Sequence, residues 1–281
     1  MFYRKTPTTL AFPAYMMNFP FTVDNREVNN VLMEAYRNQK YDYNKAFAQF
    51  MKMYSYFTQH GLVYVLPSDG DFQDQTYVAN VGCYLPHVRN DTVVLANFKS
   101  EPRRGEELIA KPFFQGLGYT VVKPSTTFEG EADLKWLRDN IYVGGYGIRT
   151  DRDTYRWLEE TTGAEITTVE MYDGGLYHFD CMFLPLTKEK ALVAVSAIRP
   201  EDLRKLEKLV EIIPVPNEYL YDAWTNCIVY GKTVMGSPAH PEWCDFIAKQ
   251  GMEPVRFDLS EFEKSGAAAS CLVMHLNYGE L

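Results

Sequence analysis

The chain has 281 residues, of which 46% are hydrophobic and 15% aromatic, enough for one large domain or two ordinary ones. A formal net charge of -9 without a long Lys or Arg run argues against binding to nucleic acid or to an anionic membrane, both of which favour basic patches. A small cationic substrate is compatible with this charge. The five cysteines include no C-x-x-C pair, which indicates neither a disulfide framework nor a structural zinc site and favours a reducing compartment.

The N-terminal segment lacks the pattern of a secretory signal, because Pro13 and Pro20 interrupt it before an apolar core of signal length develops. The longest apolar run, around residues 191–195, is far shorter than the roughly 18 residues that suggest a membrane span. We therefore expect a cytoplasmic protein with neither a membrane nor a nucleic-acid partner.

Residues 26–60 contain neither glycine nor proline, and large apolar side chains recur there at helical spacing. These side chains are Phe47, Phe50, Met51, Tyr54 and Phe57. The pattern predicts one long amphipathic helix whose aromatic face packs into the core and which ends at Gly61. A strand is expected to follow at residues 62–67.

From Thr76 the chain repeats the order strand, strand, helix, strand, a ββαβ unit. The first unit covers residues 76–122 and begins with a predicted strand at residues 76–82. Similar units follow at 181–215 and 227–257, and a less regular one lies at 132–169. Unit starts near 76, 132, 181, 227 and 271 lie about 45 to 55 residues apart, which is typical of a repeat architecture.

The fifth unit is incomplete, since only one strand follows Cys271. The N-terminal region supplies the missing parts: a strand at residues 15–18, the long helix, and the strand at 62–67. We therefore expect the two ends of the chain to complete one module together. This arrangement predicts an α/β propeller of five modules around a pseudo-fivefold axis, in one domain of residues 1–281. The alternative is a plain α+β domain in which the spacing is coincidental.

Chemically reactive side chains stand around the first strand of each unit. Asn80 lies in the first unit, Glu129 and His178 just before the second and third, Asn226 before Cys227 in the fourth, and Cys271 opens the fifth. If the units are equivalent, these residues converge on the axis. A cysteine with a histidine and a carboxylate can provide a nucleophile, an acid/base and an orienting group. The alternative for Cys271, which follows a run of small residues, is core filling.

Asp180 lies two residues after His178, so both side chains point to one side if this segment is extended. A carboxylate beside a thiolate requires a cation, and a guanidinium fits best because its planar donors pair with carboxylates. A metal site is the alternative, but the sequence near these two residues offers no further His or Cys ligand.

Six short motifs resemble those of the pentein superfamily of guanidino-group-modifying enzymes, and most closely those of arginine dihydrolases, which are related to arginine deiminases and dimethylarginine dimethylaminohydrolases. The motifs occur in the expected order over nearly the whole chain, at residues 77–82 (Tyr-Val-Ala-Asn-Val-Gly), 103–107, 128–133, 144–150, 177–180 and 265–272.

The resemblance implies the pentein fold and a role for each matching residue. Cys271 matches the nucleophile, His178 the general acid/base, and Glu129 a carboxylate at the guanidinium. The substrate-binding positions that the resemblance suggests are Asp180 for the guanidinium nitrogens, Arg103 and Arg149 for the α-carboxylate, Asp133 at the end of its motif, and, more loosely, Asn30 and Asn18. Neither a metal nor an organic cofactor is implied.

The expected reaction is hydrolysis of L-arginine to L-ornithine, CO2 and two NH3, with Asn80 holding the neutral ureido group for the second attack. The deiminases have an Asp at this position. The alternatives are a deiminase or dimethylarginine dimethylaminohydrolase that yields citrulline, an amidinotransferase, and a non-catalytic binding factor of the same fold. The chain departs from the family pattern at Glu131, where a small residue is usual; its carboxylate either disturbs the thiolate or points to solvent. A homo-oligomer is possible.

Overall fold

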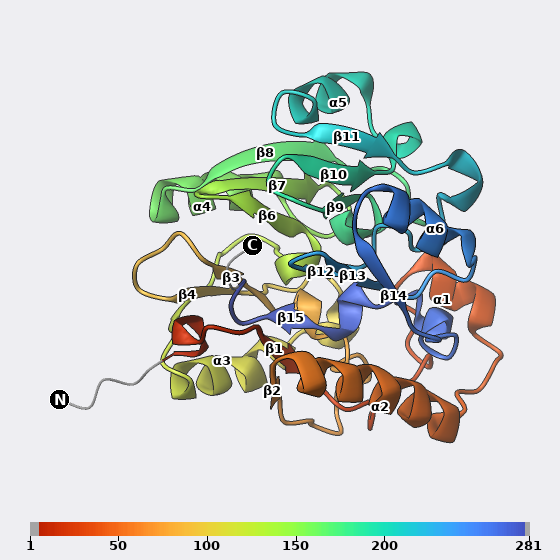
Figure 1. Ribbon diagram of the computed structural model, residues 1–281. Helices are drawn as coiled ribbons and strands as arrows, with labels where there is room; N and C mark the ends of the chain where they lie inside the picture. Colours follow the sequence, from red (N-terminus) through yellow and green to blue (C-terminus); the bar gives the residue numbers. More distant parts are fainter. Residues whose placement is uncertain (1–5, 279–281) are drawn as a thin grey trace.

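The computed structural model describes residues 6–278, which contain five three-stranded sheets with one shared connectivity (Figure 1). In each sheet the first strand is antiparallel to the second, and the third is parallel to the second. A helix connects the second strand to the third, as a parallel crossover requires. The prediction of five ββαβ modules is therefore confirmed.

Four modules follow one another along the chain. Their elements are β3 (Gly82–Leu85), β4 (Thr92–Leu95), α3 (Glu106–Gly116) and β5 (Thr120–Val122); β6 (Leu134–Arg138), β7 (Ile141–Tyr146), α4 (Arg152–Thr162) and β8 (Glu165–Glu170); β9 (Phe183–Pro185), β10 (Lys190–Val193), α5 (Pro200–Leu206) and β11 (Glu211–Pro214); and β12 (Ile228–Tyr230), β13 (Thr233–Gly236), α6 (Glu242–Lys249) and β14 (Glu253–Arg256).

The two ends of the described chain share the fifth module. Strand β15 (Met274–His275) pairs antiparallel with β1 (Ala14–Met17), which pairs in parallel with β2 (Leu62–Val65). Helix α2 (Tyr43–His60) precedes β2, so the module has the same layout as the other four. In Figure 1 the first and last strands accordingly lie side by side, as the sequence predicted.

The prediction of one continuous helix over residues 26–60 is wrong. The structure has two helices there, α1 (Val31–Tyr36) and α2, separated by residues 37–42. Asn30 caps the start of α1 by accepting hydrogen bonds from two backbone N–H groups, and Asp42 caps α2 in the same way through one. A side-chain oxygen that takes the first free N–H groups of a helix favours a new start at that point.

The predicted apolar face of α2 is confirmed in part: Phe50 and Phe57 are buried against its own sheet, Met51 and Tyr54 are half-buried, and Phe47 is exposed. Met53, which was not predicted, is buried with them. No helix within residues 6–278 is long and apolar enough to cross a membrane.

Short 3-10 turns, and not strands, carry Asn80 and Cys271, and Glu129 and His178 directly precede two further turns of this kind. These turns are η2 (Val78–Asn80), η4 (Gly130–Ala132), η5 (Phe179–Cys181) and η9 (Ser270–Leu272), each of which ends just before the first strand of a module. The predicted strand at residues 76–82 is therefore wrong. In η4, Gly130 has φ +68°, and a Cβ there would lie 2.5 Å from the carbonyl oxygen of Ala79, so glycine lets two of these turns pack together.

Candidate active site

The turns that precede the first strands meet at one end of the axis. Asn80, Glu129, His178, Asn226 and Cys271 are all buried there, as the repeat predicted. A cavity of about 20 Å³ lies among them and is lined by Cys271, His178 and Asn80. A volume of this size holds about one water molecule, so a larger ligand requires the surrounding side chains to move apart.

Cys271 is held by the amide of Asn226, whose Nδ2 lies 3.5 Å from the sulfur. The Oδ1 of Asn226 accepts a hydrogen bond of 3.0 Å from the backbone N–H of Ser270, which fixes the amide in this orientation. Burial and the negative charge of Asp180 raise the pKa of Cys271 to about 12. The ligand-free site therefore holds a neutral thiol at pH 7.

His178 forms an ion pair with Glu129, with 2.9 Å between Nε2 and Oε2. The other oxygen of Glu129 accepts backbone hydrogen bonds of 3.1 Å from Lys99 and Ser100. Burial alone would raise the pKa of Glu129, but the hydrogen bond and charge of His178, with nearby arginines, lower it to about 2. Glu129 is therefore a fixed negative charge behind the histidine and does not itself line the cavity.

The amide of Asn80 has a defined orientation. Arg103 donates from Nη1 to Oδ1 of Asn80 at 2.6 Å, and an arginine can only donate. The Nδ2 of Asn80 therefore faces the ring of His178, 3.3 Å from its Nε2. Arg103 also binds Glu106 at 2.7 Å, and it donates to backbone carbonyls, so most of its donors already have protein partners.

Asp74 is a cavity residue that the sequence reasoning missed. It is fully buried and lines the cavity with Cys271, and its Oδ1 has no hydrogen-bond partner among residues 6–278. Burial raises the pKa of Asp74 to about 6, partly offset by the charges of Arg103 and Arg149, so the carboxylate is mostly ionised at pH 7. An unpartnered buried carboxylate that faces a cavity is well placed to receive a cation.

A wider cavity of about 310 Å³ lies next to the small one and shares four of its lining residues, Asn29, Asn30, Arg149 and Tyr177. Arg149 donates to the carbonyl of Asn29 at 2.5 Å, and Asn30 donates to the carbonyl of Ser265 at 3.0 Å. Both predicted substrate-binding residues, Arg149 and Asn30, therefore belong to the wall between the outer and the inner cavity.

Three other predicted site residues do not line the inner cavity. Asp180 lies behind Cys271 and accepts a 2.7 Å hydrogen bond from the Ser270 hydroxyl. Asp133 accepts from Thr150 at 2.7 Å and from the backbone N–H of Phe179 at 3.0 Å. Asn18 donates to the carbonyl of Leu66 at 3.1 Å. Within residues 6–278, no group of three or more His, Cys, Asp or Glu side chains is arranged to hold a metal ion.

Two expectations about individual side chains are wrong. His178 and Asp180 do not share one extended face, because residues 179–181 form the turn η5. The carboxylate of Glu131 neither meets the thiol nor reaches solvent. It is buried, and it accepts hydrogen bonds from the ring and the backbone N–H of His275 at 2.5 and 2.9 Å.

Comparisons with known proteins agree with this geometry. The family model described as "N,N dimethylarginine dimethylhydrolase, eukaryotic" matches residues 17–278. The bifunctional arginine dihydrolase/ornithine cyclodeaminase AgrE of Nostoc sp. is 27% identical over 268 residues, which cover 93% of this chain and 37% of AgrE. The uncharacterized protein YkgA of Bacillus subtilis is 31% identical over 222 residues, covering 78% of this chain and 75% of YkgA.

The crystal structure of unliganded AgrE superposes with a TM-score of 0.88 at 26% identity and covers 94% of this chain and 39% of AgrE. The described chain thus corresponds to somewhat more than a third of that relative. The family match over residues 17–278, the five modules, and the Cys, His and Glu side chains gathered at one end of the axis lead to one conclusion. The chain belongs to the N,N-dimethylarginine dimethylhydrolase family, guanidino-modifying hydrolases with the pentein fold.

Proposed function

We propose that this protein is an arginine dihydrolase that converts L-arginine and two molecules of water into L-ornithine, CO2 and two NH3, with residues 1–281 acting as one catalytic domain. The likeness to AgrE supports this substrate, since AgrE is named an arginine dihydrolase and its structure with L-arginine is known. The cyclodeaminase activity in that name is not transferred, because this chain matches only 37% of AgrE.

The substrate itself activates the nucleophile. Cys271 carries a pKa of about 12 in the ligand-free site because it is buried beside the negative charge of Asp180. A guanidinium that enters the inner cavity brings a positive charge next to the sulfur, which favours the thiolate. The free oxygen of Asp74 can hold this cation, while Arg149 in the outer wall can receive the α-carboxylate.

The first half-reaction needs one proton donor. The thiolate of Cys271 attacks the central guanidinium carbon, and protonated His178 gives its proton to the nitrogen that leaves as NH3. His178 then removes a proton from water, which attacks the Cys-linked thiouronium and releases citrulline with regeneration of the thiol. Glu129 stabilises the cationic form of His178 throughout, since it stays ionised.

The orientation of Asn80 is the observation that carries the second half-reaction. With Oδ1 fixed by Arg103, the Nδ2 of Asn80 points toward His178 and can donate to the oxygen of a ureido group. A carboxylate at this position would repel that oxygen. The bound citrulline can therefore undergo a second attack by Cys271, which releases another NH3 and leaves a Cys-linked carbamoyl group that water converts to ornithine and CO2.

Hydrolysis of dimethylarginine to citrulline and dimethylamine is a second candidate, favoured by the description of the matching family model. The 25% identical Mycobacterium tuberculosis relative carries the same activity in its name. The two functions differ in their products. A dihydrolase forms ornithine and ammonia from arginine, whereas the second enzyme forms citrulline and a methylated amine.

The test is product analysis by mass spectrometry after incubation of the purified protein with L-arginine, asymmetric dimethylarginine, agmatine or guanidinoacetate. We expect ornithine and two equivalents of ammonia from L-arginine. Citrulline as the end product from arginine would contradict the second hydrolysis, and turnover of dimethylarginine alone would select the second candidate. The same incubation with Cys271→Ala controls for contaminating activity.

A further inference from the structure

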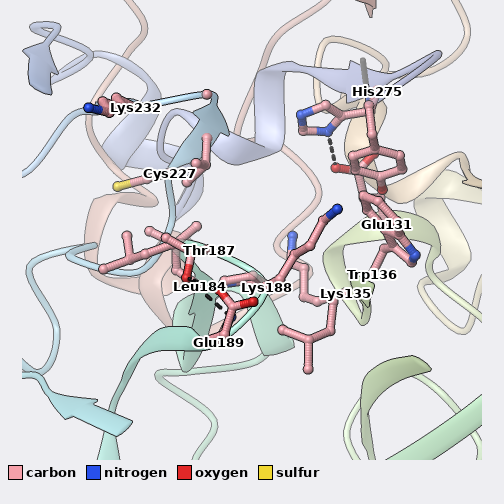
Figure 2. A pocket seen from close by; sticks show the side chains of 16 residues that line it. Glu131, Lys135, Trp136, Leu184, Thr187, Lys188, Glu189, Cys227, Lys232 and His275 are labelled. Atoms are coloured by element: carbon pink, nitrogen blue, oxygen red, sulfur yellow. Dashed lines mark hydrogen bonds and ion pairs between the residues drawn. The ribbon is translucent and has the colours of Figure 1, made fainter. Parts of the chain in front are cut away.

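A second, larger cavity lies at the opposite end of the axis from Cys271. It measures about 370 Å³, within the range of small-molecule sites, and its lining includes residues of the first strands β6, β9, β12 and β15 (Figure 2). The catalytic side chains precede these strands, whereas the cavity is reached further along the same strands. We call this cavity the axial pocket.

Positive charge predominates in the axial pocket. Lys135, Lys188 and Lys232 line it together with two carboxylates, Glu131 and Glu189. The side chain of Lys135 makes no hydrogen bond or ion pair with any residue in the range 6–278. Its Nζ is not among the buried atoms, so it can pair with an anion that enters the pocket.

His275 adds a second unpartnered polar group. Its Nδ1 and backbone N–H are both bound to Glu131, while its Nε2 is buried and has no partner among the described residues. In Figure 2 this free nitrogen points away from Glu131. An unsatisfied buried nitrogen is unfavourable, so a group that hydrogen-bonds to it removes this cost.

The rest of the wall is apolar and partly aromatic. Trp136 and Tyr278 contact each other with ring centroids 4.8 Å apart, and Tyr278 stacks on His275 at the same distance. Aliphatic side chains complete the wall: Leu137, Leu184, Leu186 and Val229. Such a surface suits a flat apolar body, which stacks on aromatic rings.

We propose that the axial pocket binds a small organic carboxylate with an aromatic body, whose carboxylate pairs with Lys135 and accepts a hydrogen bond from Nε2 of His275 in the doubly protonated form of that ring, while the aromatic body packs against Trp136. This site is separate from the arginine-binding cavity, since the two share no lining residue. The protein would therefore bind a second ligand, whose negative charge is opposite to that of a guanidinium.

The experiment uses three probes of matched shape: 3-phenylpropionate, the neutral 3-phenylpropionamide and the cationic 3-phenylpropylamine. Titration calorimetry measures binding to the wild-type protein, and the change in tryptophan fluorescence that is lost in Trp136→Phe reports contact with Trp136. A ligand of this size allows a Kd of about 1 mM or lower for the carboxylate. We expect the amide to bind at least about tenfold more weakly, because it lacks the charge that pairs with Lys135. Equal affinity for all three probes would overturn the proposal.

Variants locate the site. Lys135→Met should weaken 3-phenylpropionate at least about tenfold, whereas Lys52→Met on the exposed face of α2 should not change it. If Lys135→Met fails to fold, the comparison of the three probes on the wild-type protein still tests whether the pocket prefers a carboxylate. Competition by saturating L-arginine in Cys271→Ala would assign binding to the catalytic cavity and overturn the proposal.

Discussion

The two ends of the axis differ in how much space is left between their polar groups, although each keeps a buried polar atom without a partner among the described residues: Asp74 Oδ1 and Tyr77 Oη at the catalytic end, and His275 Nε2 at the other. At the catalytic end, His178, Asn80 and Cys271 each have protein partners, and the cavity left between them measures about 20 Å³. At the other end, Lys135 and the Nε2 of His275 face a cavity of about 370 Å³ without a partner in the range 6–278.

One end of the axis is therefore built to hold side chains in place, and the other has space for a ligand. The catalytic end holds its reacting groups at fixed distances and leaves one carboxylate oxygen, on Asp74, for the incoming cation. The axial pocket has more room, and its polar side chains are fixed only in part, through the hydrogen bonds between Glu131 and His275. The two ends also interact, because the charge of Lys135 lowers the pKa of Cys271, although burial and Asp180 raise it more. Changes at one end can therefore be compared with matched changes at the other.

Cys271→Ala should have the largest effect. Without the nucleophile, ammonia release from L-arginine should fall at least about 1,000-fold, while the small neutral side chain leaves the fold intact. Cys244→Ala is the matched control, since Cys244 is a half-buried cysteine that lines neither cavity, and it should retain activity. Steady-state ammonia assays with circular dichroism measure both, and ammonia release by Cys271→Ala at the wild-type rate would refute covalent catalysis.

Gly130→Ala tests how tightly the catalytic end is packed. The new Cβ would lie 2.5 Å from the oxygen of Ala79 and 2.7 Å from the carbonyl of Asn80, so the turns that carry Asn80 and Glu129 must separate. A displacement of about 1 Å can reduce activity about 100-fold.

Gly163→Ala separates backbone strain from crowding in this test. Gly163 has φ +74°, close to the +68° of Gly130, but a Cβ there meets no atom within 4 Å. It should therefore lose stability without losing kcat. Equal kcat values for the two variants would show that contact between the turns is not required for activity.

The sequence predicted the modules and the proximity of three candidate site residues because both depend on local patterns. Strand and helix periods repeat along the chain, and equivalent positions in the repeats predict that Cys271, His178 and Glu129 lie at one end of the axis. The closure of the fifth module followed from a missing strand at one end and a surplus strand at the other.

What the sequence could not predict depends on contacts between distant segments. Asp74 lies in a loop outside the repeats, and its free oxygen becomes evident only once Asn29 is seen to occupy the other one. The turn at residues 179–181 depends on a hydrogen bond from the backbone N–H of Met182 to the carbonyl of Phe179. The rule that residues i and i+2 of a strand share a face gives no sign of this hydrogen bond. Glu131 was misplaced because its partner, His275, is 144 positions away.

Asn80→Asp should change the product more than the rate of the first step. The new carboxylate would accept from Arg103 with one oxygen and present the other to the ureido oxygen of bound citrulline, which it repels. We expect citrulline to become the main product, with the ornithine yield reduced about tenfold or more. Chromatographic separation of the two amino acids measures the ratio. Ornithine as the sole product of the variant would remove Asn80 from the second hydrolysis.

Alkylation of Cys271 should depend steeply on pH. Because burial and Asp180 raise its pKa to about 12, the thiolate fraction should increase about tenfold per pH unit through pH 9, where a thiol with pKa near 8.5 levels off. The rate of iodoacetamide labelling at Cys271, followed by peptide mass spectrometry, gives this slope, and L-arginine should protect the residue. A plateau near pH 8 would mean that the thiol is not perturbed in this way.

Glu131→Gln should have the smallest effect on activity, within about twofold, because Glu131 lies on the axial side and contacts no reacting group. It should instead lower the free energy of unfolding at pH 7 by about 1–3 kcal/mol, since the amide nitrogen would face one of the two N–H donors of His275.

The effect of Glu131→Gln should depend on pH. Burial opposes ionisation of Glu131, but His275 outweighs burial and lowers the pKa of Glu131, so the wild-type carboxylate stabilises the fold at pH values above the usual pKa of a glutamate. This contribution is lost as the pH falls through the lowered pKa of the folded state, so the wild type and variant should converge in acid. Denaturant titrations at pH 7 and at about pH 3 measure the gap, with exposed Glu165→Gln as the control. A gap that does not narrow in acid would show that the ion pair with His275 is not its source.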